Sequence, residues 1–202
     1  MAYDLIDLKF SSNPKDCCYF FDSNILLPIL GLPNDRQNTE SYLKYFKSVY
    51  TNCLEKPDLK IYTCTNQLSE IFNILMNFEM KKIYGDVQKK DYPDNRKFFK
   101  EVFRPSENYT KKLELYKQEF FNYSEVFEVA DLGDLPLSDL LSFNAKTLDF
   151  NDQVILQCVE KTNAILVSDD SDFYGQEIRQ ATFNGNLIRR FKDKPVKAAI
   201  KL

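Results

Sequence analysis

The chain has 202 residues, 44% of them hydrophobic and 14% aromatic, which is enough apolar material for a domain with a buried core. It contains no histidine, which excludes Ser-His-Asp and Cys-His catalysis and zinc sites with histidine ligands. The net charge of −3 gives the whole chain no attraction to nucleic acid, and no apolar stretch approaches the ~20 residues of a membrane span.

The first ten residues, MAYDLIDLKF, lack the basic segment and apolar run of a secretory signal. The five cysteines are odd in number and form no CxxC pair, so we expect reduced thiols rather than a disulfide framework. Together these features predict a cytoplasmic protein.

The segment CCYFFD, residues 17–22, reads as a short buried strand without alternation. Asp22, Ser23 and Asn24 then supply helix N-cap residue types, and ILLPILGLP predicts a short or irregular helix because Pro28 lies beyond its first turn. A carboxylate at the end of an apolar strand is costly unless a cap, a salt bridge or a metal ion compensates it.

Two further pairs of elements follow. Asn38 to Glu40 opens an amphipathic helix, and LKIYTC, residues 59–64, predicts a second strand. The next helix, residues 66–84, carries an apolar stripe at helical spacing, formed by Leu68, Ile71, Phe72, Leu75 and Phe78.

Residues 85–136 change in character and predict a largely helical insertion or cap within a single domain that covers residues 1–202. Residues 81–120 hold eleven Lys and Arg against seven Asp and Glu. The basic residues form either a solvated, salt-bridged surface or a face that binds the phosphates of a nucleic acid. The aromatic residues of this stretch could stack on bases, fill the core or line a groove for a partner helix.

The remaining elements restore the alternation. SEVFEVADL predicts a short strand, PLSDLLSF a short helix, LDFNDQVILQCVEKTN a periodic helix, AILVS a buried strand and NGNLIRRF a last strand. Alternating strands and helices predict an α/β fold, a three-layer α/β/α sandwich around a mostly parallel sheet.

Several carboxylates are expected at one edge of this sheet, where the strands end. Asp22 ends the first strand, Glu70 and Asp152 lie near the starts of two helices, and Asp170 and Asp172 follow the strand AILVS. Crowded carboxylates repel one another, and Mg²⁺ or Mn²⁺ relieves this because both prefer hard oxygen ligands.

Each feature alone also has an ordinary structural explanation. Asp22 would be an N-cap, Glu70 a solvated or capping residue, and Asp149 an acid that complements a helix dipole. The acidic residues 169–172 would be a polar turn. Their occurrence together, in order and each after the expected strand or helix, favours one shared site.

Four stretches give the sequence a resemblance to the PIN-domain family of metal-dependent nucleases, which includes VapC-type toxins. They are YFFDSNILL, NQLSEIFNIL, DFNDQVILQCVEKTNA and ILVSDDSDF, in the order typical of the family. The resemblance implies that Asp22, Glu70 and Asp152 are metal-site carboxylates, that Asp170 or Asp172 is the fourth, and that Ser168 helps to orient them. One departure is the separation of Glu70 from Asp152, which is longer than in compact members because of the charged stretch 85–136.

The resemblance further implies an endoribonuclease that uses Mg²⁺ or Mn²⁺ and leaves 5′-phosphate and 3′-hydroxyl ends. Its substrate would be RNA, with Lys81 and Lys82 near the backbone; toxin-type members would also imply a homodimer and an antitoxin-like partner, which no residue here establishes. Two alternatives stay open: a catalytically silent PIN-fold binding module, and a metal-dependent phosphatase. A phosphatase with paired aspartates is disfavoured because Asn24 stands where its second Asp would be, and the five ungrouped glycines form no P-loop.

Overall fold

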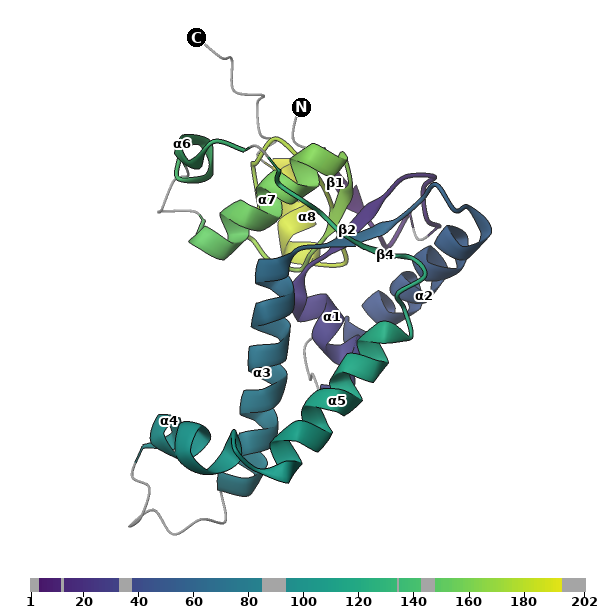
Figure 1. Cartoon of the computed structure of the whole chain (residues 1–202). Helices are drawn as coiled ribbons and strands as arrows, with labels where there is room; N and C mark the ends of the chain where they lie inside the picture. The colour runs from purple at the N-terminus through teal and green to yellow at the C-terminus, as the bar shows by residue number, and fades with distance from the viewer. Residues whose placement is uncertain are drawn as a thin grey trace.

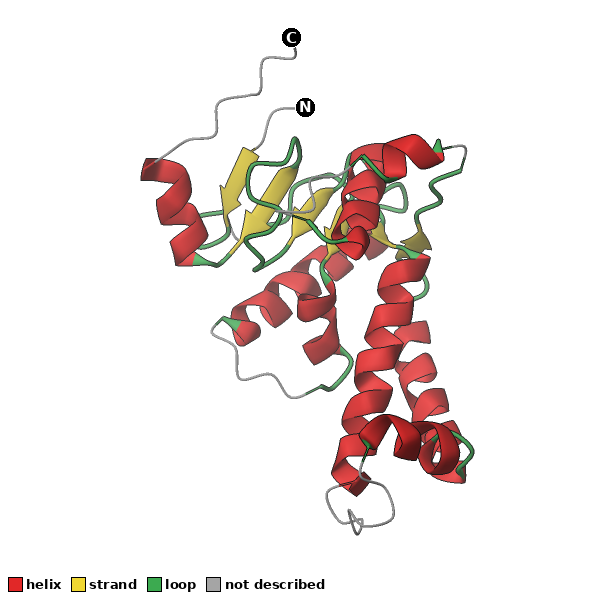
Figure 2. Ribbon diagram, turned by 90° about the vertical axis from the view of Figure 1, so that its left-hand side faces the viewer, coloured by secondary structure: helices red, strands yellow, loops and turns green. Residues whose placement is uncertain are grey.

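The computed structural model describes residues 4–11, 13–32, 38–84, 94–133, 135–142 and 148–193. Within these ranges the chain forms one parallel sheet with helices on both of its faces (Figures 1 and 2). This confirms the predicted α/β class and the three-layer α/β/α arrangement.

The sheet has six strands in the order β1-β6-β5-β2-β3-β4, and all five pairings are parallel. Parallel neighbours require crossover connections, which the helices between the strands supply. The strands are β1 (Asp4–Asp7), β2 (Tyr19–Phe21), β3 (Ile61–Thr63), β4 (Phe127–Val129), β5 (Ile165–Val167) and β6 (Arg179–Thr182).

The helices differ widely in length, and α2 and α3 are the longest of those described. They are α1 (Ser23–Ile29), α2 (Thr39–Glu55), α3 (Thr65–Tyr84), α4 (Asn95–Phe98), the π-helical turn η1 (Phe99–Phe103), α5 (Glu107–Phe121), α6 (Leu137–Leu140), α7 (Phe150–Thr162) and α8 (Gly185–Asp193). None of the helices in the described part of the chain is long and apolar enough to cross a membrane.

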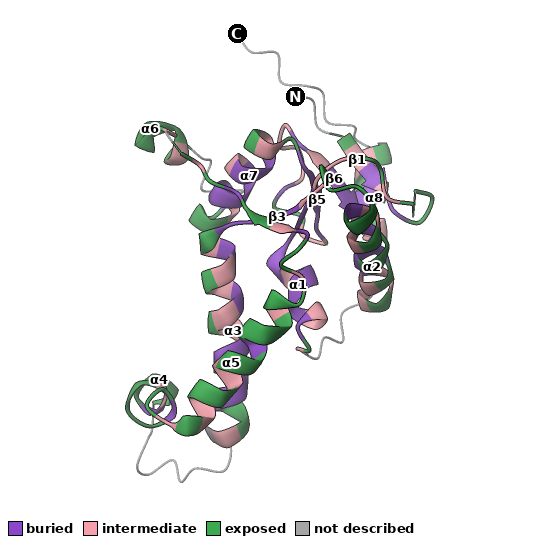
Figure 3. Ribbon diagram, turned by 45° about the vertical axis from the view of Figure 1, so that its right-hand side comes forward, coloured by how far each residue is buried: buried purple, intermediate pink, exposed green. Residues whose placement is uncertain are grey.

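The core lies on both faces of the sheet, because successive side chains of a strand point to opposite sides. Tyr19 and Phe21 of β2 pack with residues of α1, α2 and α3, whereas Phe20 packs with residues of α7. All three are fully buried, and Figure 3 colours much of the central sheet as buried. The three residues of β2 are therefore all aromatic and without alternation because both faces of the strand are covered.

Helices α3 and α5 extend away from the sheet as a paired arm (Figure 1). Buried Glu79 of α3 joins them: it accepts hydrogen bonds from Tyr116 (2.8 Å) and Lys82 (2.7 Å) and forms an ion pair with Lys112 at 3.2 Å. Within the predicted insertion 85–136, the structure describes 94–133 and 135–136, which contain α4, η1 and α5; β4, in the same stretch, is an edge strand of the central sheet.

The prediction of a last strand at NGNLIRRF is wrong, because this segment forms α8. Asn184 caps it, since its side-chain oxygen accepts from the backbone N–H of Asn186 (3.0 Å) and Leu187 (3.4 Å). The strand of this region is β6, just before it, and the sequence interpretation also missed β1, which pairs with β6.

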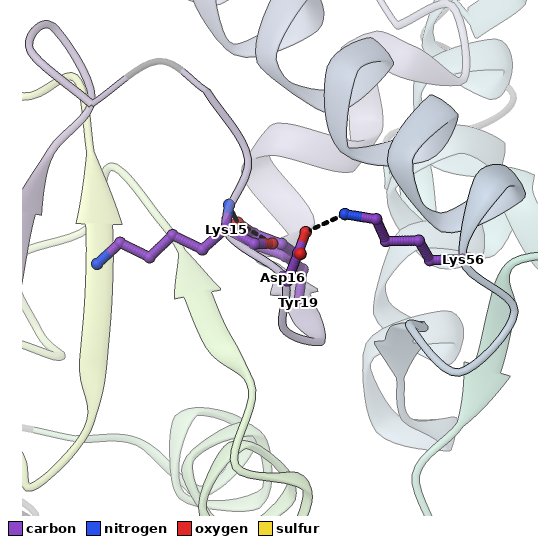
Figure 4. A network of polar contacts seen from close by, with 4 residues as sticks. All are labelled: Lys15, Asp16, Tyr19 and Lys56. Carbon is purple, nitrogen blue, oxygen red and sulfur yellow. Dashed lines mark hydrogen bonds and ion pairs between the residues drawn. The ribbon is translucent and has the colours of Figure 1, made fainter.

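The amino end of β2 is tied to the end of α2, at the edge of the sheet opposite Asp22 (Figure 4). The hydroxyl of Tyr19 accepts from the backbone N–H of Lys15 at 2.7 Å, and Asp16 forms an ion pair with Lys56. The amino end of this short strand is therefore fixed by side-chain contacts.

Candidate functional site

Asp22 lies directly after β2, at the carboxyl edge of the sheet, and is only 7% exposed. It occupies the N-cap position of α1, but its side chain makes no capping hydrogen bond. Its Oδ2 instead accepts from the hydroxyl of Ser168 at 2.7 Å. Capping therefore does not explain why a carboxylate stands here.

Ser168 connects the ends of two neighbouring strands. It follows β5, is fully buried, donates to Asp22 and accepts from the backbone N–H of Asp170 at 2.9 Å. Since β2 and β5 are paired in parallel, their ends reach the same edge, and this hydroxyl fixes the acidic loop 169–172 against Asp22.

Glu70 reaches the same edge from the second turn of α3. Its Oε2 accepts from the hydroxyl of Ser23 at 2.8 Å. Ser23 directly follows Asp22 in the chain, so this hydrogen bond connects Glu70 to the segment that carries Asp22. The start of α3 is anchored by buried Gln67, whose side-chain nitrogen donates to the carbonyl of Phe21 (2.6 Å) and whose oxygen accepts from Thr63 (2.8 Å). Gln67 thus joins the ends of β2 and β3 and positions the turn that carries Glu70.

Asp152 belongs to a capping box at the start of α7. The N-cap Asp149 accepts from the backbone N–H of Asp152 at 2.9 Å, and Asp152 Oδ2 accepts from the backbone N–H of Asp149 at 3.3 Å. Asp149 therefore has the role at the helix start that was expected for it. Asp152 takes part in the same capping box, and its charge also raises the pKa of Asp22.

The pKa values show that these carboxyl groups are electrostatically coupled. Burial raises the pKa of Asp22 to about 7; the Ser168 hydrogen bond opposes this rise, and the charges of Asp170 and Asp152 add to it. Burial likewise raises the pKa of Asp152 to about 6; the hydrogen bond from the Asp149 backbone opposes this rise, and the charges of Asp149, Asp170 and Asp172 add to it. No described Lys or Arg forms an ion pair with Asp22, Glu70, Asp152, Asp170 or Asp172.

The three aspartates of the loop after β5 have different roles. Asp170 is partly buried, and its charge raises the pKa values of both Asp22 and Asp152. Asp172 is exposed, and its charge raises the pKa of Asp152. Burial and the charge of Asp170 raise the pKa of Asp172. Asp169 turns toward α2, where Tyr42 donates to its side chain at 2.8 Å. Asp170 is therefore the better candidate for the fourth acid.

The donor set suits a hard divalent cation, but the side chains are not gathered around one point. In the described part of the chain, no three acidic or cysteine side chains stand in an arrangement that would hold a metal ion. Oxygens of Glu70, Asp152 and Asp170 are instead engaged with Ser23, Asp149 and Asp172. Asn24, two residues after Asp22, adds a buried oxygen without a hydrogen-bond partner. Uncompensated carboxylates and an orphaned amide oxygen fit Mg²⁺ or Mn²⁺ by chemistry, and binding would require these side chains to rotate toward one another.

A polar cleft of about 480 Å³ runs along α3 from its first turn past Glu70, and it contains residues that the sequence interpretation missed. Across it, the amide of Asn66 donates to Asn151 of α7 at 3.5 Å. The missed signal was the spacing of the polar residues along one face of α3. The cleft is lined by Thr65, Asn66, Ser69, Glu70, Asn73, Ile74, Asn77 and Asn151.

No family model matches the sequence, and the search of curated proteins gave no match. Among solved structures, the chain is similar to the crystal structure of VapBC2 from Rickettsia felis bound to a DNA fragment from their promoter. The identity is 13% and the TM-score 0.47, with 82% of this chain and 98% of that chain covered. This similarity is too weak to carry a statement about family, activity or partners, so the resemblance to PIN-domain nucleases stays a prediction.

Proposed function

We propose that the chain is a metal-dependent endoribonuclease. The observation that carries the proposal is the environment of Asp22: a buried carboxyl group whose partner Ser168 also binds the backbone of Asp170, and which has no ion pair with a described cation. Buried carboxyl groups with raised pKa values and no ion pair are concentrated at functional sites. Carboxylates with a divalent cation can hydrolyse a phosphodiester, which explains how a chain without histidine could do so.

In this proposal Asp22, Glu70, Asp152 and Asp170 hold one or two Mg²⁺ or Mn²⁺ ions, and Asp172 lies at the rim. A bound ion would supply an activated water and would neutralise charge on the phosphate. Ser168 holds the Asp22 carboxylate, Ser23 holds Glu70, and Gln67 positions α3. The cleft that includes Glu70 in its lining provides a polar entrance for RNA.

The test is an assay with end-labelled RNA of mixed sequence, incubated with Mn²⁺ and with EDTA. We expect cleavage with Mn²⁺ and none with EDTA. Asp22→Asn should lower the rate at least 100-fold while the protein stays folded, because the amide keeps an oxygen for Ser168 and removes a repelling charge. Asp4→Asn is the matched control, since Asp4 is exposed on the edge strand β1.

Cleavage that persists in Asp22→Asn, or in EDTA, would contradict the proposal and point to a contaminating nuclease. Metal binding with no cleavage of RNA or of a small phosphate ester would instead favour a binding module. Hydrolysis of the ester alone would favour a phosphatase. A homodimer and an antitoxin-like protein partner belong to the same proposal and would be sought by sedimentation and by co-purification.

A further inference from the structure

The exposed face of α3 carries two clefts that join each other. The polar cleft at Glu70 continues into a second cleft of about 460 Å³ near the far end of the helix. Ile74 and Asn77 line both of them. The two clefts therefore form one groove along α3, which we call the α3 groove; its far part is lined by Leu32, Ile74, Asn77, Phe78, Lys81, Asn95 and Arg96.

The chemistry of the α3 groove changes along its length. It begins at polar residues in the first turn of α3, passes the acid Glu70 and the exposed amides of Asn73 and Asn77, and ends between the exposed cations Lys81 and Arg96. At the helical rise per residue, Glu70 and Lys81 are about 17 Å apart along α3. The groove thus has a polar end that includes Glu70, an amide-lined middle and a basic end.

The two cations at the basic end are not neutralised by the described part of the protein. In the basic stretch 81–120, five described lysines form ion pairs, namely Lys82, Lys97, Lys111, Lys112 and Lys117. Lys81 and Arg96 form none with any described residue, and neither do Lys100 and Arg104, which lie outside the groove. Five of the nine described cations in this stretch are therefore salt-bridged, and Lys81 and Arg96 are the charged pair that a ligand in the groove would meet.

The amides in the middle are also available. Asn77 donates to the backbone carbonyl of Asn73 at 2.8 Å, which leaves its own side-chain oxygen open. The side chain of Asn73 has no hydrogen bond to a described residue. An amide offers both donors and an acceptor, which is what the edges of unpaired bases require.

We propose that the α3 groove binds a single-stranded segment of RNA that leads away from the acidic site. Lys81 and Arg96 hold its phosphates, and Asn73 and Asn77 contact its bases. The proposal rests on the proposed ribonuclease function, and it names the path of the substrate. A single strand fits because its bases are free to meet the amides, whereas in a duplex those edges are paired.

Binding is measured by fluorescence anisotropy with labelled 12-nucleotide RNA in EDTA, so that the result does not depend on cleavage. Lys81→Glu/Arg96→Glu should weaken binding at least tenfold and lower the salt slope of log K by about 1.4, since each lost phosphate contact removes about 0.7 for a single strand. Lys100→Glu/Arg104→Glu, which makes the same charge change on the same arm, should stay within threefold of the original chain. Equal weakening in both variants, or in neither, would overturn the groove assignment.

A second variant tests the amides. The original chain should distinguish oligo(A), oligo(U) and oligo(C), and Asn73→Ala/Asn77→Ala should reduce that discrimination with a smaller effect on mean affinity. Unchanged discrimination would overturn the base contacts, and displacement of RNA by polyglutamate of equal charge would overturn RNA as the ligand. Cleavage in Mn²⁺ that is insensitive to all groove variants would overturn this inference alone, whereas groove-dependent binding without cleavage would overturn the proposed function alone.

Discussion

At the scale of single residues, the candidate site depends on how buried oxygens are satisfied. The sequence suggested that Asp22 needs compensation, and the structure supplies a hydroxyl from Ser168, 146 residues away. Gln67, which binds the Phe21 carbonyl across 46 residues, had no sequence signal, because one glutamine in an amphipathic helix looks like any solvated residue. Partners of this kind become visible only once the strands are placed beside one another.

Gln67→Ala should destabilise the protein by about 1–3 kcal/mol, because it leaves the buried Phe21 carbonyl and Thr63 hydroxyl without their partner. Urea unfolding at pH 7 measures the change. Gln118→Ala on exposed α5 is the control and should cost less than about 0.5 kcal/mol. If both variants lose equally little stability, Gln67 does not have the proposed anchoring role.

At the scale of elements, the sequence pattern predicted an element correctly where the burial of apolar side chains alone determined that pattern. The apolar stripe predicted α3, and the uniformly apolar runs predicted β2 and β5. It failed at β6, whose buried Gln180 and Thr182 make the strand look polar. Gln180 donates to the carbonyl of Asp170 at 3.0 Å, and Thr182 lies 3.0 Å from the hydroxyl of Tyr42. Buried polar side chains with partners are therefore what concealed this strand.

The pairing of α3 with α5 should depend on pH through Glu79. Burial alone would raise the pKa of Glu79, but hydrogen bonds from Lys82, Tyr116 and Lys112 outweigh it, so the pKa is lowered. A lowered pKa means that this stabilisation is present above the ordinary value of a glutamate and is lost as the pH falls through the value in the folded protein.

Glu79→Gln should therefore lower the free energy of unfolding at pH 7, by about 1–2 kcal/mol, and should flatten its fall on acidification. Urea unfolding at pH 7 and at pH 4 provides the comparison. Glu114→Gln, which removes an exposed ion pair with Lys117, should change little at either pH. A constant difference between Glu79→Gln and the original chain at both pH values would contradict the assignment.

At the scale of the whole molecule, the charge is distributed unevenly. The net charge is −3, yet acids gather at the carboxyl edge of the sheet, and cations of the arm are neutralised by neighbouring acids except at a few positions. The resemblance to PIN-domain proteins led to the acids of the site, and three-dimensional placement added the groove along α3. Helical spacing could have indicated the ion pairs between residues three or four apart, but not the long-range pair of Lys112 with Glu79.

The central claim is that the carboxylates of this edge bind a divalent cation, and titration with Mn²⁺ tests it most directly. Electron paramagnetic resonance measures free Mn²⁺ for the original chain, for Asp22→Asn and for the control Asp4→Asn. We expect one or two ions bound by the original chain and by Asp4→Asn, and at least tenfold weaker binding by Asp22→Asn, because it removes a buried ligand charge. No binding by the original chain, or equal binding by all three proteins, would contradict the claim.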